Sequence, residues 1–204
     1  EKENIPAILN VWFPGTEGAD AICDVIFGDK SPCGRLTVSM PRHVGQEPLY
    51  YNQLPTGRPV GEGADKFVLW KSNYLDVRND ALFPFGYGLS YTTYDYGEMT
   101  VDTDKDDVIV SVDVTNSGDC DGYEVVQCYI HDIACRYSRP VKELKGFERV
   151  FLKKGETKRV NIRLSKEDLS FYDSEGNLIF EPGEFDIMIG ANSRDLQSKR
   201  ILME

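Results

Sequence analysis

Several features that mark whole classes of protein are missing from this 204-residue sequence. No apolar run approaches the roughly 20 residues that span a bilayer, which excludes a membrane helix. Basic residues are scarce, with 23 Lys and Arg against 34 Asp and Glu, and the net charge of -11 argues against a nucleic-acid ligand. A basic, apolar leader is missing too. Because the sequence runs from Glu1 almost directly into an apolar stretch, as a mid-domain segment would, this last absence says nothing about compartment.

Residues for covalent catalysis are equally scarce. The two histidines, His43 and His131, lie far apart, and no Gly-x-Ser-x-Gly elbow occurs, so the sequence offers no pair of nucleophile and base. The five cysteines are odd in number and irregularly spaced, which favours free thiols, several of them buried, over a disulfide framework.

Two motifs imitate ligand sites. Pro14–Gly18 lies between a predicted strand and a predicted helix, but it lacks the glycine pattern of a phosphate cradle and carries an acidic residue, so we expect a tight turn. Cys128, His131 and Cys135, with Cys120 upstream, are close enough in sequence for zinc. Strand alternation puts Cys128 and His131 on opposite faces, however, which favours core and strand-end roles.

Two acidic motifs imitate a calcium loop and a catalytic pair. Asp102–Asp107 has aspartate at the sixth position, where a calcium loop requires glycine, so a solvated turn is predicted. Glu62 with Asp65, and Asp76 with Asp80, could supply the two carboxylates of sugar hydrolysis. Nothing in their polar surroundings would raise the pKa of one member of either pair. We therefore expect no catalytic, cofactor-binding or metal-binding residue in this chain.

The N-terminal residues have the pattern strand, helix, strand. Ala7–Phe13 is almost continuously apolar, which is typical of a strand buried on both faces of a parallel sheet. Thr16 is placed to cap a helix over Glu17–Phe27, and Gly28 is placed to end it. A second strand is predicted over Arg35–Met40. Two strands and one helix are too few for a stable domain, so this unit has the character of the end of a larger sheet.

Between His43 and Asp80 the sequence is rich in proline, glycine and aromatic residues and has no clear periodicity. A segment of this length without regular structure is usually functional or draped over another domain. We expect it to wrap the surface of the molecule through four aromatic anchors: Tyr50, Tyr51, Trp70 and Tyr74.

Leu82–Thr93, called the aromatic seam below, separates the α/β pattern from an all-β pattern. It contains four aromatic rings (Phe83, Phe85, Tyr87 and Tyr91), one proline and two glycines. A flexible linker would be polar and rich in serine and glycine, whereas these rings need a large surface to lie against. We predict a rigid joint between two units, residues 1–90 and 91–204.

After the seam, short alternating runs are separated by turn signals. Valines at every second position of Val108–Val114 indicate a half-buried strand. Further strands are predicted over Glu124–His131, Leu144–Leu152, Val160–Leu164 and Phe185–Ile189. About seven short strands at this spacing favour an immunoglobulin-like or fibronectin type III-like sandwich. The predicted fold class is therefore mainly β, with such a β-sandwich preceded by a partial α/β unit.

Ordered motifs along nearly the whole chain resemble glycoside hydrolase family 3, the β-glucosidase group. The segment from Ala7 to Leu36 resembles the last strand-helix-strand unit of the family's second domain. Motifs similar to the periplasmic β-glucosidase branch and to its C-terminal fibronectin type III-like domain follow in order: Thr56-Gly57-Arg58-Pro59, Phe83–Tyr91, Gly122–Gln127, Arg139–Phe147 and Glu181-Pro182-Gly183.

The resemblance implies a C-terminal fragment of a retaining β-glucosidase-like hydrolase that is periplasmic or secreted. The family's nucleophile and acid/base belong to a barrel and an α/β sandwich upstream of Glu1, so neither role passes to a residue here. The fragment is then expected to be structural and inactive alone. Its partners would be the missing N-terminal catalytic domains, and it would meet β-glucosides only through them.

Two other roles remain open from the residues alone. Exposed aromatic rings stack on sugars, and Tyr129, Tyr137 and Tyr172 are candidates for a carbohydrate-binding face. An orphaned apolar strand at Ala7–Phe13 would instead invite self-association through its unpaired edge.

Overall fold

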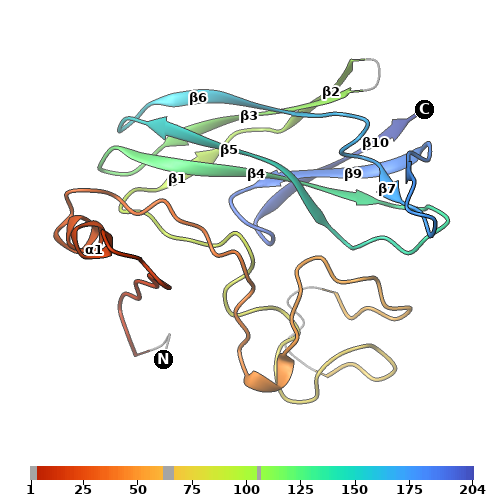
Figure 1. The fold of residues 1–204 in the computed structure, drawn as a ribbon, viewed down its shortest axis with the longest axis horizontal. Helices are drawn as coiled ribbons and strands as arrows, with labels where there is room; N and C mark the ends of the chain where they lie inside the picture. The colour runs from red at the N-terminus through yellow and green to blue at the C-terminus, as the bar shows by residue number, and fades with distance from the viewer. Residues whose placement is uncertain (1–3, 62–66, 105–106) are drawn as a thin grey trace.

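Figure 1 shows the fold as a computed structural model, which describes residues 4–61, 67–104 and 107–204. The C-terminal part forms a two-sheet sandwich of antiparallel strands, and the N-terminal residues run along one side of it. The predicted mainly-β fold is confirmed. Among the described residues, no helix is long and apolar enough to cross a membrane.

The two sheets face each other across the core. The first contains β1 (Tyr94–Tyr96), β2 (Thr100–Asp104), β3 (Asp107–Asn116) and β6 (Thr157–Leu164). β2 pairs with the first half of β3, and β1 pairs with its last three residues. β6 pairs with β3 along the whole length of β6. The second sheet has the order β10-β9-β4-β5, built from β4 (Gly122–Asp132), β5 (Glu143–Leu152), β9 (Gly183–Gly190) and β10 (Leu196–Met203). A short hairpin, β7 (Phe171–Tyr172) with β8 (Leu178–Ile179), lies near one end of the sandwich.

The core follows from the alternation of apolar and polar side chains on the facing strands. The alternating valines of β3 are completely buried, as the sequence predicts. They pack against side chains that β4 and β9 contribute from the opposite sheet: Val126, Cys128 and Ile130, then Phe185, Ile187 and Ile189. The predicted strands over these residues, and over β5 and β6, agree with the structure.

The predicted helix is confirmed as α1 (Gly18–Phe27), and it ends at Gly28, whose φ of 84° is left-handed. The cap differs from the prediction. Glu17, not Thr16, occupies the N-cap position, and its side chain makes no capping hydrogen bond. The helix packs loosely, since Gly18 is its one buried residue.

The two strands predicted beside this helix are wrong. Residues 7–13 and 35–40 contain no strand, apart from a single bridge between Met40 and Phe83. A strand buried on both faces needs neighbours for its backbone hydrogen bonds, and the described residues supply no such neighbours for Ala7–Phe13. Phe13 is consequently fully exposed.

In the segment between His43 and Asp80, the described residues, 43–61 and 67–80, have little regular structure beyond one 3-10 turn, η1 (Val44–Gln46). Two of its expected anchors are held. Tyr51 packs on the seam, and the hydroxyl of Tyr74 donates to the carbonyl of Gln46 at 3.1 Å. The other two, Tyr50 and Trp70, are exposed. Trp70 lies in a turn and has a left-handed φ of 65°.

Candidate functional site at the joint with the sandwich

The aromatic seam lies on the outer face of the second sheet. Phe85 stacks on Tyr51 with ring centroids 4.0 Å apart, and Tyr51 meets the buried ring of Tyr129 on β4 edge-on at 5.9 Å. The backbone is fixed as well, because the amide of Ser193 in the β9–β10 loop donates to the carbonyl of Phe85 at 2.9 Å. The seam is thus a joint between the N-terminal residues and the sandwich.

The remaining rings of the seam contact one another or the N-terminal residues. Phe83 and Tyr87 contact each other, with centroids 5.2 Å apart. The hydroxyl of Tyr91 donates to the carbonyl of Val25 near the end of α1 at 2.6 Å. The segment predicted as a second strand also bonds to the seam, since the amide of Leu36 donates to the carbonyl of Tyr87 at 2.8 Å. One stretch of chain therefore ties the helix to the sandwich.

A buried amide side chain on β4 holds the seam by hydrogen bonds. Gln127 of β4 donates from Nε2 to the carbonyl of Gly86 at 3.0 Å and to the carbonyl of Ala191 at 2.7 Å. Its Oε1 accepts from the hydroxyl of Tyr129 at 2.6 Å. Gly86 has φ 78° and lies so close that a Cβ at this position would overlap the Gln127 amide. Glycine is therefore required at position 86 for both its conformation and its size.

A buried ion pair makes a second link across the joint. Arg35 donates to the carboxylate of Glu124 on β4 at 2.6 Å, and the side chains of the two residues are 10% and 3% exposed. Tyr96 of β1 donates its hydroxyl to the other carboxylate oxygen at 2.8 Å. Burial raises the pKa of Glu124, and Arg35 offsets that effect only in part. The pair joins a residue of the N-terminal segment to the two sheets at once.

Three arginines converge on Asp80, which is the third link. Arg42 and Arg78 each donate two hydrogen bonds to its carboxylate, and Arg194 of the β9–β10 loop lies 3.4 Å away. Burial alone would raise the pKa of Asp80, but the hydrogen bonds and charges of Arg42 and Arg78 outweigh burial and lower it to about 2. Asp80 is therefore a structural anion rather than a general acid.

Asp80 should make the free energy of unfolding fall as the pH is lowered into the acid range. A carboxyl group whose pKa is lowered in the folded state stabilises fully above its unfolded pKa, and that stability is lost as the pH falls through the folded value. The shift from 3.8 to about 2 corresponds to about 2 kcal/mol, lost between about pH 4 and pH 2. Asp80→Asn should remove this amount at neutral pH and flatten the acid limb in urea unfolding measured over a pH series. Asp76→Asn, at an exposed neighbour, is the control and should change neither; equal curves for Asp80→Asn and the unmodified chain would contradict the prediction.

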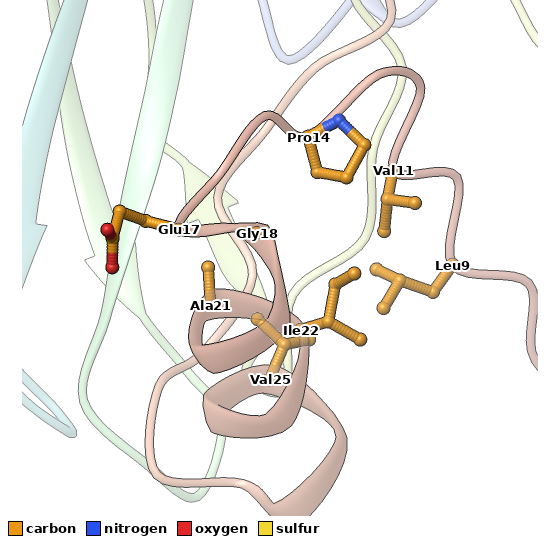
Figure 2. A pocket seen from close by; sticks show the side chains of 8 residues that line it. All are labelled: Leu9, Val11, Pro14, Glu17, Gly18, Ala21, Ile22 and Val25. Atoms are coloured by element: carbon orange, nitrogen blue, oxygen red, sulfur yellow. The ribbon is translucent and has the colours of Figure 1, made fainter.

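An apolar groove lies on the side of α1 (Figure 2). Leu9 and Val11 of the N-terminal segment face Ile22 and Val25 of the helix, while Glu17 points away from them. The hollow measures about 390 Å³. Exposed apolar side chains are frequent in this part of the chain: Ile5, Ile8, Leu9, Val11, Trp12, Phe13, Ile26 and Phe27. A patch of this kind marks an interaction surface.

The motifs that imitate metal sites are dispersed in the structure. Cys128 is buried in the core, and burial raises the pKa of its thiol to about 12. Its predicted alternation with His131 holds, because His131 lies half-buried outside that core. All five cysteines are free, although only Cys128 is fully buried where several were expected to be. In the described part of the chain, no three His, Cys, Asp or Glu side chains are grouped so that they could hold a metal ion.

The acidic and turn motifs take the following positions. Asp102 and Asp104 belong to β2, and Asp107 begins β3, where Arg163 pairs with it. Glu62 and Asp65 lie outside the described residues. Asp76 is exposed while Asp80 is buried among arginines, so this pair has no shared site. The Pro14–Gly18 turn forms one wall of the apolar groove, with Gly18 packed against Pro14.

Two known domain families match separate parts of the chain. Residues 1–91 match the glycosyl hydrolase family 3 C-terminal domain, and residues 124–193 match a fibronectin type III-like domain. Residues 1–91 are the C-terminal domain of a glycosyl hydrolase family 3 protein by this match. The resemblance seen in the sequence is confirmed. Among similar proteins is a periplasmic β-glucosidase of Salmonella typhimurium, 46% identical over 95% of this chain and 26% of its own length.

Other relatives in family 3 agree. A β-xylosidase of Formosa agariphila is 43% identical over 94% of this chain and 26% of its own length. The solved structure of a β-glucosidase from Listeria innocua in complex with glucose superimposes with a TM-score of 0.90 at 38% identity, covering 98% of this chain and 28% of that one. The chain thus spans about a quarter of the length of the relatives it matches.

Proposed function

We propose that this chain is the structural, C-terminal part of a β-glucosidase-like hydrolase whose catalytic residues lie in other domains of the same protein. The joint is the observation that carries the proposal. The seam, the Arg35–Glu124 pair and the Asp80 cluster hold residues matched to a hydrolase domain against a sandwich that has a core of its own. Such a sandwich would brace the catalytic domains and would not hydrolyse glycosides alone.

The proposal includes a division into two units, residues 1–90 and 91–204. The fully buried hydrophobic core starts at Met99, and the side chains packed against it start at Tyr94, so no described residue of the first 90 contributes to that core. The N-terminal unit therefore depends on the sandwich and on whatever covers its apolar groove. We assign that cover to the preceding part of the α/β domain. The compartment we propose is the periplasm or the exterior, which the Salmonella relative supports.

The assay is hydrolysis of nitrophenyl β-glucoside. The 204-residue chain alone should release no nitrophenol above the buffer rate. A chimera that replaces the matching segment of the Salmonella β-glucosidase with this chain should hydrolyse the substrate. Gly86→Ala in that chimera, which disrupts the joint, should lower the yield of folded, active enzyme more than Gly155→Ala, which strains the backbone of an open turn without touching the joint. Turnover by the isolated chain, or an inactive but folded chimera, would overturn the proposal.

Self-association is the second candidate, favoured by the exposed apolar residues around Phe13 rather than by the strand edge that the sequence suggested. Light scattering of the isolated chain, compared with a Phe13→Ser and Phe27→Ser variant, tests it. Self-association is supported if the mass of the unmodified chain rises with concentration while the variant keeps the mass of a monomer. If both keep the mass of a monomer, this candidate is ruled out.

A further inference from the structure

A second hollow, separate from the joint, opens where β4 ends. It measures about 120 Å³ and lies between the β4–β5 loop and Pro55 of the N-terminal segment. Polar and aromatic side chains from the end of β4 and from the loop line it: His131, Asp132, Cys135, Tyr137, Ser138 and Arg139. His131 and Cys135 belong to the metal motif considered above, but the proposed structural role uses none of these lining residues.

Asp132 is the buried acceptor of the hollow. The residue is only 8% exposed, and its carboxylate accepts from the amide of Ala134. The thiol of Cys135 is shared between this carboxylate and the carbonyl of Tyr137, 2.9 Å from the sulfur. Among the described residues, no Lys or Arg forms an ion pair with Asp132. A carboxylate has about four acceptor positions, so Asp132 can accept further hydrogen bonds from a ligand.

The nearby arginines are engaged elsewhere. Arg139 pairs with Glu143 at 2.7 Å, and Arg136 pairs with Glu181. Arg139 still lines the hollow and places positive charge opposite Asp132. A ligand anion would be repelled by Asp132, and a ligand cation by Arg139. A neutral ligand with several hydroxyl groups suits both, because hydroxyls donate to a carboxylate and accept from a guanidinium or from Ser138.

An aromatic ring stands at the rim. Tyr137 is 40% exposed and meets Phe171 edge-on with centroids 5.9 Å apart, while its hydroxyl lies 3.4 Å from Oγ of Ser174. The ring is thus held in place with part of its surface open, as stacking on a sugar requires. Of the other tyrosines suggested for sugar binding, Tyr129 is buried beneath the seam, and Tyr172 is exposed on the β7–β8 hairpin and does not line the hollow.

The size of the hollow limits the ligand. A volume of about 120 Å³ falls below the ~300 Å³ of common ligand pockets. It matches the hydroxyl-bearing edge of one pyranose ring. We propose that this hollow is a surface site for a single sugar unit of a neutral saccharide, with Asp132 accepting from adjacent hydroxyls and Tyr137 packing on the ring. The choice of gluco- and xylo-sugars as probes rests on the proposed function.

The test is an amide NMR titration of the complete 204-residue chain with glucose, xylose and cellobiose. Saturable shifts are expected at the amides of residues 131–139 and next to Pro55, with cellobiose binding no more than about twofold tighter than glucose because one ring fills the site. Asp132→Asn should weaken binding about tenfold or more, since a hydrogen bond to a charged acceptor is lost. Tyr137→Ala should weaken it several-fold.

Tyr172→Ala is the matched control and should bind as the unmodified chain does. If Asp132→Asn loses the dispersed spectrum of a folded chain, Ser138→Ala and Tyr137→Ala carry the test. Shifts that never saturate, saturable shifts elsewhere, or variants with unchanged affinity would overturn the site. Tighter saturation of the same amides by calcium or ethanolamine would overturn its saccharide class. An active chimera in the hydrolysis assay together with no sugar binding here would leave the proposed function standing and remove only this site.

Discussion

Replacing Gly86 with alanine is expected to lower the free energy of unfolding by about 3 kcal/mol or more and to release the aromatic seam from the sandwich. Alanine resists the left-handed backbone, with φ of 78°, at a cost of about 1–2 kcal/mol. Its Cβ would also overlap the side-chain amide of Gln127. Displacing that amide leaves the Tyr129 hydroxyl and two carbonyls without their buried partner, which costs about 1–3 kcal/mol.

Gly155→Ala separates the two contributions. Gly155 has φ 74°, nearly that of Gly86, but a Cβ there would meet nothing within 4 Å. It should therefore show the backbone cost alone, about 1–2 kcal/mol. The difference between the two variants in urea unfolding reports the packing of the seam on Gln127. Equal losses for both variants would mean that the contact contributes nothing.

Hydrogen exchange should localise the damage. In Gly86→Ala, the protected amides bonded to the seam, such as that of Met40, should exchange faster, while those of β3 stay protected because the sandwich has its own core. Uniform acceleration across β3 and the seam would instead show that the two units unfold as one. The same measurement tests the proposed division of the chain near residue 90.

The strands of the sandwich were predictable from local pattern. The two strands predicted in the N-terminal segment are absent from the structure. The alternation of Val108–Val114 depends only on which face is buried, and both sheets are present to bury it. Ala7–Phe13 has the composition of a buried strand, but the burial depends on partner strands that are not among the described residues. β1 and β2 escaped prediction because they are short segments on one edge of β3. Composition indicates what a segment can do, and tertiary partners decide whether it does so.

The joint was predicted at the seam, but its charged links were missed. Asp80 lies near Arg78 in sequence, whereas Arg42 and Arg194 are brought in by the fold, and spacing alone cannot foresee them. Glu124 did carry a signal. It shares its strand face with Val126, Cys128 and Ile130, so the alternation that predicts a core also places a carboxylate inside it. A charged residue at an inward position requires a partner, and the pattern could have prompted a search for one.

Glu124→Ala is expected to cost about 3–5 kcal/mol, because it leaves the guanidinium of Arg35 buried without its counter-charge. The Tyr96 hydroxyl would lose its acceptor as well. The measurement is the urea midpoint and slope of the variant. Glu184→Ala is the matched control: it removes a carboxylate from β9 whose side chain is 55% exposed and 3.7 Å from Arg200, and it should change stability by no more than about 1 kcal/mol. A loss for Glu124→Ala as small as that of the control would contradict the prediction.

Replacing the whole buried cluster should reverse most of the loss. Burial raises the pKa of Glu124 despite the adjacent Arg35, so desolvation of the carboxylate opposes the pairing. One nitrogen of Arg35, Nε, also has no hydrogen-bond partner among the described residues. The variant Arg35→Met with Glu124→Leu and Tyr96→Phe removes every buried polar group of the link together. We expect it to recover to within about 1 kcal/mol of the unmodified chain, or to exceed it, since apolar replacement of a buried ion pair is often neutral or stabilising. If the triple variant is as unstable as Glu124→Ala, the link itself, and not the stranded charge, holds the N-terminal unit to the sandwich.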